Sequence, residues 1–362
     1  MSSQQEFKIH FGWNDFFENQ LTNIAVNDQM VVAKVINEER NLYELEYDYG
    51  KTVHAQISGK IHYKATGRIH YPAVGDWVLA EMNPHNERAV IKHVLERKNM
   101  LKRKQIGASD DIQILAANVD VVFIATSLNA NLNINRLYRY LTFVKDSKAR
   151  PVILLTKSDL LHESEKIAEQ VKHQFPDVDV HLLTSIKFEE ATFLREYLGV
   201  GITAAIVGSS GVGKSTLVNY LIGDERIKTA DVREGDDKGP HTTTARSLYK
   251  TIFGGLIIDS PGVRELQFMG HDEGFKDQFA DIEELVQTCR YTNCTHTHEK
   301  DCAVMSALES DELSIERWKS YKKIRGEVLH ELRKENKWML AEVRKTWKKR
   351  SIEARKRVRG EI

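Results

Sequence analysis

The chain has 362 residues, a length that predicts two or three domains because single hydrophobic cores rarely grow beyond about 250 residues. Its 52 basic and 52 acidic residues cancel, so no global field marks a nucleic-acid-binding protein, and its 41% hydrophobic content is ordinary for a globular chain. No apolar run reaches the roughly 18 residues that span a bilayer, and the N-terminus lacks the pattern of a secretory signal. We expect a cytoplasmic monomer with no membrane association.

The chain up to about residue 100 is predicted to hold a small β-barrel. Short strand-like segments follow one another closely, separated by Gly, Asn and Asp turns, and no helical pattern of convincing length lies between them. These segments are 30–36, 42–49, 52–58, 76–82 and 88–95.

After Ala117 the pattern changes to that of an α/β domain. Continuous apolar segments are typical of buried parallel strands, and the amphipathic stretches 133–146 and 164–175 between the first of them predict helices on both faces of a sheet. The predicted strands are 119–126, 150–156, 178–185, 202–208 and 255–260.

Beyond Phe279 the strands end, and the chain is predicted to be helical in 281–289 and from Ala303 onward. From Arg317 onward Lys and Arg are dense, and this run is either a solvated helical face or a tail that faces RNA. A partial apolar stripe, which we interpret as packing, consists of Trp318, Tyr321, Val328, Leu332 and Trp338.

The segment GSSGVGKST, residues 208–216, matches the phosphate-loop pattern G-x-x-x-x-G-K-[ST]. It follows a predicted strand and opens a helical run, which is the context that the motif requires. Lys214 is expected to reach the β- and γ-oxygens of a nucleotide, and the Ser215 hydroxyl to bind Mg²⁺. A chance glycine-rich turn is the alternative, but strand, Lys and Ser together argue against it. The predicted nucleotide ligands in this loop are Gly208, Ser209, Ser210, Gly211, Val212, Gly213, Lys214, Ser215 and Thr216.

Two motifs downstream are expected to complete this site. In LIIDSPG, Asp259 ends an apolar strand and is expected to hold Mg²⁺ through water, while the Gly262 N–H faces the γ-phosphate. Between the motifs, GPHTTTARSL places three threonines where a switch threonine closes on Mg²⁺ and the γ-phosphate. We assign this role to Thr243, within one residue either way, and a simple polar turn is the alternative.

A base-reading motif, TKSDL at residues 156–160, ends another predicted strand. The Asp159 carboxylate can accept from N1–H and the 2-amine of guanine, whereas adenine has an acceptor at N1 and no 2-amine, so this residue selects GTP over ATP. Lys157 belongs to the same motif, and Thr156 stands where Asn is usual, so we expect somewhat weaker nucleotide binding. Ser185, after the next strand, is predicted to contact the guanine O6 region.

The base motif precedes the phosphate loop in this chain, whereas the reverse order is usual in small GTPases. Both motifs follow strands and can face one crevice at the carboxyl ends of those strands. A circular permutation of the domain therefore reconciles all the motifs, and it makes the switch region lead directly into the C-terminal domain.

The only three cysteines lie in one short segment, Cys289-x₄-Cys294-x-His296-x₅-Cys302. An odd number in a cytosolic chain argues against a disulfide framework. Three thiolates and one imidazole make a closed tetrahedral Zn²⁺ site with no position for a catalytic water, so we predict one structural zinc. His298 is a competing fourth ligand.

Together these motifs resemble one family, the ribosome small-subunit-dependent GTPases called RsgA, which are circularly permuted. The resemblance implies a multidomain protein with an all-β OB-type barrel in 1–100, an α/β circularly permuted P-loop GTPase domain in 101–278, and an α-helical zinc-binding domain with a basic tail in 279–362. It covers nearly the whole chain and is carried by YPAVGDWV, AANVDVVFIAT, TKSDL, GSSGVGKST, HTTT, DSPGVRE and CTHTHEKDCAV.

The resemblance also implies a function. It implies binding to the small ribosomal subunit and its rRNA late in maturation, hydrolysis of GTP to GDP and phosphate stimulated by that subunit, and release afterwards. Val263 stands where many GTPases keep a water-orienting Gln, so His241, beside the threonines, is the family-like catalytic candidate together with Lys214 and Thr243.

Two other functions compete with this one. An RNA-associated placeholder would use GTP only as a binding switch, and its turnover would not respond to the subunit. An ATP-using P-loop enzyme would not depend on Asp159 for its choice of nucleotide.

Overall fold

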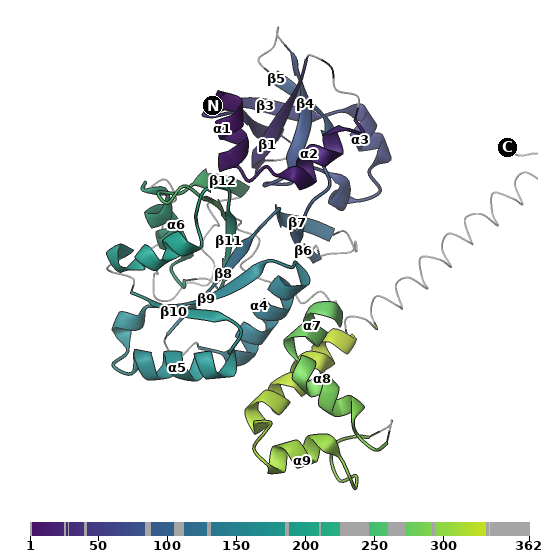
Figure 1. Ribbon diagram of the computed structural model, residues 1–362, viewed down its shortest axis with the longest axis vertical. Coiled ribbons are helices and arrows are strands. Elements are labelled where there is room, and N and C mark those ends of the chain that lie inside the picture. Colours follow the sequence, from purple (N-terminus) through teal and green to yellow (C-terminus); the bar gives the residue numbers. More distant parts are fainter. Residues whose placement is uncertain are drawn as a thin grey trace, which may run out of the picture. The chain divides into compact units, whose positions relative to one another are not determined.

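The computed structural model of the protein describes residues 2–24, 27, 29–39, 42–83, 88–104, 112–128, 132–184, 188–209, 211–224, 246–259, 272–291, 294–330 and 333. Its contacts divide the chain into two compact units, Met1–Gln267 and Phe268–Ile362, and each is described by itself. The first unit holds the barrel and the α/β sheet, and the second is helical (Figure 1). The domain boundaries expected at residues 100 and 278 stay predictions.

The expected barrel is built from five strands, β1 (Met30–Glu39), β2 (Leu42–Asp48), β3 (Lys51–Ile57), β4 (Trp77–Asn83) and β5 (Arg88–Val94). Their order is β1-β2-β3-β5-β4, and β4 also pairs with β1, so the sheet closes on itself. Alternate side chains of each strand point inward, as Tyr43 and Leu45 of β2 do. The fold class expected for this part of the chain is confirmed.

Three short helices flank the barrel and were not predicted from the sequence: α1 (Ser3–His10), α2 (Asp15–Leu21) and α3 (Gly59–Lys64). α1 begins with a capping box, in which the Ser2 hydroxyl accepts from the Gln5 N–H and the Gln5 side chain accepts from the Ser2 N–H. Phe7 and Phe17 of α1 and α2 pack against Trp77, with ring centroids 5.5 and 6.1 Å away. The N-terminal residues are therefore part of the folded unit.

The α/β sheet consists of β8 (Val121–Ser127), β9 (Arg150–Thr156), β10 (Asp179–Leu183), β11 (Thr203–Gly208), β12 (Arg246–Lys250) and β13 (Leu256–Asp259). Its order is β10-β9-β8-β11-β13-β12, and every neighbouring pair is parallel except β12 with β13. A separate antiparallel pair is made by β6 (Met100–Lys104) and β7 (Ile112–Ala117). The predicted parallel sheet is present.

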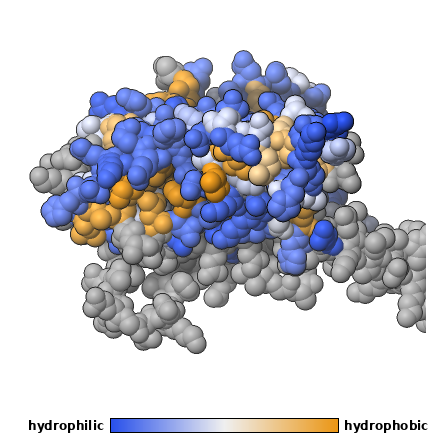
Figure 2. All heavy atoms as spheres, turned by 90° about the horizontal axis from the view of Figure 1, so that it is seen from below, coloured by the Kyte–Doolittle hydropathy of each residue, from blue (hydrophilic) through white to orange (hydrophobic). Residues whose placement is uncertain are grey.

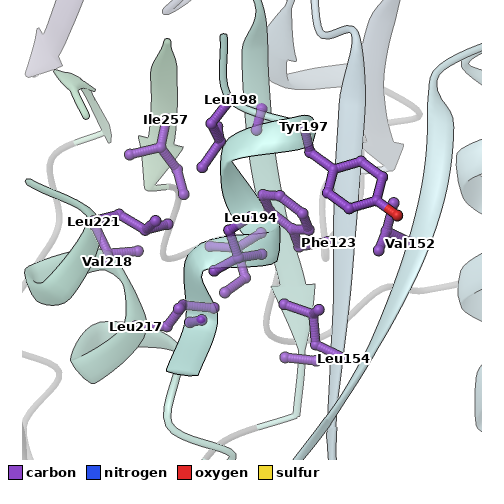
Figure 3. Packing of buried hydrophobic residues seen from close by; sticks show 14 of the residues in the cluster. Phe123, Val152, Leu154, Leu194, Tyr197, Leu198, Leu217, Val218, Leu221 and Ile257 are labelled. Atoms are coloured by element: carbon purple, nitrogen blue, oxygen red, sulfur yellow. The ribbon is translucent and has the colours of Figure 1, made fainter. Parts of the chain in front are cut away.

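Helices cover both faces of this sheet, namely α4 (Ile134–Asp146), α5 (Ser164–Gln174), α6 (Lys214–Ile222) and the 3-10 segments η2 (Ser158–Leu160) and η3 (Phe188–Glu196). On one face Phe123 and Leu154 pack with Leu194 of η3 and Leu217 of α6 (Figure 3). Val122 is also fully buried, and since successive strand residues point to opposite faces, it belongs to the other side, which α4 covers. This burial on two sides explains the continuous apolar runs in the sequence.

β12 joins the sheet to the barrel. It pairs with β13 on one side and with β1 on the other, so eleven strands form one hydrogen-bonded sheet. Two ion pairs accompany this ladder, Arg246 with Glu38 at 2.8 Å and Lys250 with Glu46 at 2.6 Å. The sequence pattern did not predict β12, because only one of its five residues is buried.

A second joint lies where the barrel chain passes into the α/β sheet. The Asn118 side-chain amide donates to the Gly75 carbonyl at 3.0 Å. Gly75 has φ 94°, and an added Cβ would lie 2.2 Å from the Ala117 carbonyl oxygen. Nearby, Arg97 makes two hydrogen bonds of 2.8 and 2.7 Å with the fully buried Asp76. The joint is thus a buried polar network with satisfied partners.

The second unit contains α7 (Asp272–Gln278), α8 (Ala280–Gln287), α9 (Ala303–Glu309) and a further helical stretch over 315–330. Phe275, Phe279 and Tyr321 form an aromatic core, with ring centroids between 5.1 and 5.5 Å apart. Trp318 and Val328 are buried too, so the described part of the apolar stripe serves packing. Leu332 and Trp338 lie outside the described residues.

The displayed surface is mostly hydrophilic, with hydrophobic side chains in smaller clusters between (Figure 2). Within the described ranges, no helix has both the length and the apolar character needed to cross a bilayer. Among the large hydrophobic side chains that are exposed, Tyr63 of α3 stands out at 92% exposure.

Candidate nucleotide site and metal centre

The base motif and the phosphate loop follow strands that are close together in the sheet. Thr156, the last residue of β9, pairs with Ser127 of β8. Gly208, the last residue of β11, pairs with Ala125, two residues earlier on the same β8. Because these strands are parallel, their carboxyl ends lie at one sheet edge, which is where open α/β sheets bind ligands. The two motifs, in reversed order along the chain, are thus brought together in space.

The phosphate loop has a backbone that suits glycine at three positions. Gly208 lies so close to β8 that an added Cβ would be 2.2 Å from the Ala125 carbonyl oxygen. Gly211 and Gly213 have φ angles of 75° and 91°, a region that glycine adopts without steric cost. α6 begins directly afterwards, and the N–H groups of its first turn, which have no intrahelical acceptor, are suited to bind an anion.

Lys214 is buried at the start of α6. Its ammonium group donates to the Gly208 carbonyl at 2.8 Å and to the Ser209 carbonyl at 2.5 Å. The positive charge is therefore held against the loop, where a phosphate would need it. Ser215 follows half-buried and Thr216 exposed, both in the first turn of α6.

Thr156 ties the base motif to the phosphate loop. Its side chain is buried, and its hydroxyl donates to the Val212 carbonyl at 2.8 Å. Lys157, next in the chain, has the left-handed φ of 59° and is the N-cap residue that precedes η2. A threonine thus makes the tether between the two loops, and the departure from Asn leaves them connected.

A cavity of about 290 Å³ lies at the ends of β9 and β10. Asp159 lines it, and the base-reading role of this residue stays a prediction. The size of the cavity is near the lower end for small-molecule pockets, roughly 300 Å³. The sequence reading missed Ser164 and Glu165 at the start of α5, because nothing in their local pattern shows that they approach β10. The lining residues are Ser158, Asp159, Ser164, Glu165, Leu182, Leu183 and Thr184.

Asp259 ends β13, as expected for the carboxylate of D-x-x-G, and β13 is the neighbour of β11 in the sheet. The remaining predicted residues of the nucleotide site lie outside the described residues: Ser185, Ser210, His241, Thr243 and Gly262. Their assignments stay predictions.

The four predicted metal ligands come together in the second unit. One ligand atom from each of Cys289, Cys294, His296 and Cys302 lies within 4.8 Å of all the others. His296 Nδ1 is 3.5 Å from the sulfur atoms of both Cys289 and Cys302. Burial lowers the pKa of His296, which favours the neutral imidazole that a metal needs. His298 is not part of this cluster.

The loop between the cysteines is held by an acidic residue that the sequence reading missed. The Glu299 carboxylate accepts from the backbone N–H groups of Thr295 at 2.7 Å and Thr297 at 3.0 Å. Hydrogen bonds from the Thr295 hydroxyl and from these N–H groups hold the pKa of Glu299 well below its ordinary value. The His296 ring also meets Trp318 edge-on, with centroids 5.5 Å apart. The donor set and its support fit a tetrahedral zinc ion.

Because the base-reading loop and the phosphate loop meet at one sheet edge in reversed chain order, the fold defines a circularly permuted P-loop nucleotide-binding protein. A family model described as RsgA GTPase matches residues 94–269. The chain belongs to the RsgA GTPase family, and it is a GTPase.

Known relatives agree along most of the chain. It is 37% identical to the small ribosomal subunit biogenesis GTPase RsgA 2 of Vibrio parahaemolyticus, over 86% of this chain and 83% of that protein. It is 35% identical to the small ribosomal subunit biogenesis GTPase RsgA of Opitutus terrae, over 96% of this chain and 98% of that protein. The crystal structure of YloQ, a circularly permuted GTPase, superposes with a TM-score of 0.61 at 24% identity, over 85% and 98%. The permutation expected from the motif order is confirmed.

Proposed function

We propose that this GTPase binds the small ribosomal subunit and its rRNA late in maturation, and that hydrolysis stimulated by the subunit drives its release. The observation that carries the proposal is the tether between Thr156 and Val212, which joins a base-reading loop and a phosphate loop into one site. The names of its relatives supply the cellular setting, small ribosomal subunit biogenesis.

The chemistry follows from the placement of the chain's own groups. Asp159 lines the base cavity and accepts from guanine, while the phosphate loop and the first turn of α6 donate N–H groups to the phosphates. Lys214 stabilises the charge that develops on the γ-phosphate as water attacks in line. Mg²⁺ held by Ser215, Thr243 and Asp259 would supply charge neutralisation. We assign the orientation of the attacking water to His241.

The cysteine cluster is proposed to hold one structural zinc ion. Its four ligands close a tetrahedral set, so no position remains for a substrate or a catalytic water. The ion would stabilise the fold of the second unit, because the helices around it leave only a small core. We also propose that the protein acts in the cytoplasm as a monomer, which light scattering at working concentration would test.

A GTPase assay titrated with purified small subunits, mature and immature, tests the proposal. We expect turnover to rise with subunit concentration and to saturate, and the GDP-bound protein to dissociate faster than the GTP-bound protein. Turnover that does not respond to either kind of subunit would instead support the placeholder function, in which GTP only sets binding and release.

A further inference from the structure

A short segment of the barrel carries a positive charge that the neutral chain as a whole does not. Residues 58–75 contain three Lys or Arg side chains and no Asp or Glu. This segment forms α3 and the following 3-10 turn η1 (Arg68–His70), and α3 lies on the outside of the barrel (Figure 1). We call the following exposed side chains the α3 surface: Lys60, His62, Tyr63, Lys64, Arg68 and His70.

The backbone beneath the α3 surface is fixed. The Ser58 hydroxyl accepts from the Ile61 N–H, and Ile61 packs against the barrel core. Behind η1, the Tyr71 hydroxyl and His62 Nδ1 lie at 2.8 Å, and Arg97 donates to the Tyr71 carbonyl at 2.8 Å. A helix of six residues is too short to be stable alone, so these contacts hold it in place.

On this fixed backbone the Tyr63 ring is 92% exposed, and two lysines flank it one turn apart. In the described parts of the chain, no carboxylate lies within ion-pair distance of Lys60 or Lys64. The pKa of His93 on the neighbouring strand β5 is lowered, first by burial and then by the positive charges of these two lysines. The α3 surface thus presents an exposed aromatic ring with an ammonium group on either side of it.

We propose that the α3 surface binds an unpaired RNA segment, with a base stacked on Tyr63 and phosphates contacted by Lys60 and Lys64. This inference rests on the proposed function, because the small ribosomal subunit is the RNA source. Unpaired bases stack on aromatic side chains, whereas an A-form duplex is contacted through phosphates and 2′-hydroxyls and gives an exposed ring no partner. An acidic protein surface is the alternative partner, and the crosslinking measurement below distinguishes it from RNA.

The experiment measures binding of the full-length protein to small subunits and to a labelled single-stranded RNA, over a range of salt concentrations. Tyr63→Ala is expected to weaken both by about tenfold, and Tyr63→Phe to retain wild-type affinity because stacking needs only the ring. Lys60→Ala/Lys64→Ala is expected to lower the salt slope by about 1.4, since each single-strand phosphate contact contributes about 0.7. Intrinsic GTP hydrolysis and thermal unfolding should not change.

The matched control is Lys166→Ala/Lys172→Ala on α5, which removes two exposed lysines elsewhere in the same unit and should leave the affinities unchanged. If subunits stimulate the wild-type protein, but Tyr63→Ala and Lys60→Ala/Lys64→Ala bind subunits and RNA as tightly as the wild type, the α3-surface proposal is wrong and the proposed function stands. If subunits bind neither the wild type nor the variants, the proposed function fails, and binding of the single-stranded RNA still tests the α3 surface. A photocrosslinker at position 63 should attach to rRNA, and attachment to a ribosomal protein would overturn the inference.

Discussion

The two halves of the nucleotide site come from residues 56 positions apart, since the Thr156 hydroxyl donates to the Val212 carbonyl. The four ligands of the cysteine cluster, by contrast, all lie within residues 289–302. The first site exists only when β8, β9 and β11 are in register, so it is a product of the whole sheet. The second is a local loop, and the zinc ion that we propose it holds is expected to contribute much of its order. A substitution in the nucleotide site should therefore lower turnover and leave the fold intact, whereas a substitution of a metal ligand should unfold the second unit.

The largest effect is expected from Lys214→Ala, which should reduce GTP turnover by roughly 100- to 1000-fold or more. The ammonium group is buried against the phosphate loop, and removing one charge donor at a developing oxyanion has this order of cost. Phosphate release in the presence of saturating subunits is the measurement. Zinc content and the unfolding of the second unit should not change, and wild-type turnover by this variant would disprove the role of the loop.

Cys294→Ser should disrupt the cysteine cluster and leave the nucleotide site unchanged. We expect about one zinc per chain in the wild type by elemental analysis, and its loss in the variant, with limited proteolysis then cutting the second unit. GDP binding by the first unit should remain. His298→Ala is the matched control, because this neighbouring histidine lies outside the cluster and its removal should leave the zinc bound. A fully folded, metal-free wild type would contradict the assignment.

Asp159→Asn should weaken GDP binding by roughly 10- to 100-fold, because one of the two carboxylate acceptors becomes an NH₂ donor that faces a guanine N–H donor. The preference for guanine over adenine nucleotides should fall in the same measurement, a competition of labelled GDP against GTP and ATP. The matched control is Glu165→Gln, because Glu165 lines the same cavity and its substitution should change nucleotide affinity little. Selectivity that survives Asp159→Asn would favour an ATP-using enzyme or another base-reading residue.

The smallest effect is expected from Thr156→Val, which tests directly whether the nucleotide site depends on the contact between its two loops. Thr156→Val keeps the shape of the side chain but removes the hydrogen bond to Val212, which has a net value of about 1 kcal/mol, so nucleotide affinity should fall about fivefold. Thr156→Ser retains the hydroxyl and should restore most of it. Equal affinities for all three proteins would show that the two loops are held together by the sheet alone.

Much of this architecture was predictable because buried parallel strands leave continuous apolar runs, as in residues 121–127 and 150–156. The phosphate loop was predictable from its motif spacing, because its glycines are required by the local backbone geometry. β12 was missed because its five residues alternate without an apolar run, and its place depends on pairing with β1 and β13. The helix α1 had a readable signal in its Ser2–Gln5 capping box, but no apolar periodicity strong enough to call attention to it.

The predictions of individual side chains likewise succeeded where a local pattern determines the position and were incomplete where tertiary packing does. The spacing of the cysteine segment left His296 and His298 open, and only the folded loop, with Glu299 accepting from its backbone, shows which histidine meets the cysteines. Likewise Glu165 reaches the cavity that Asp159 lines because α5 begins beside β10, a relation between segments about 18 residues apart that no local pattern encodes. Neighbours set by tertiary packing are what the sequence pattern could not supply.

The ladder between β12 and β1 has a practical consequence. β12 owes its outer hydrogen-bond partners to the barrel, so a nucleotide-binding domain cut away from residues 1–100 would present an open edge strand with unpaired N–H and C=O groups. Such an edge is a template for a second chain, and the fragment would tend to aggregate or dimerise by strand addition. The barrel thus also acts as an edge protector, which makes the two folds inseparable as building blocks even though their architectures are unrelated.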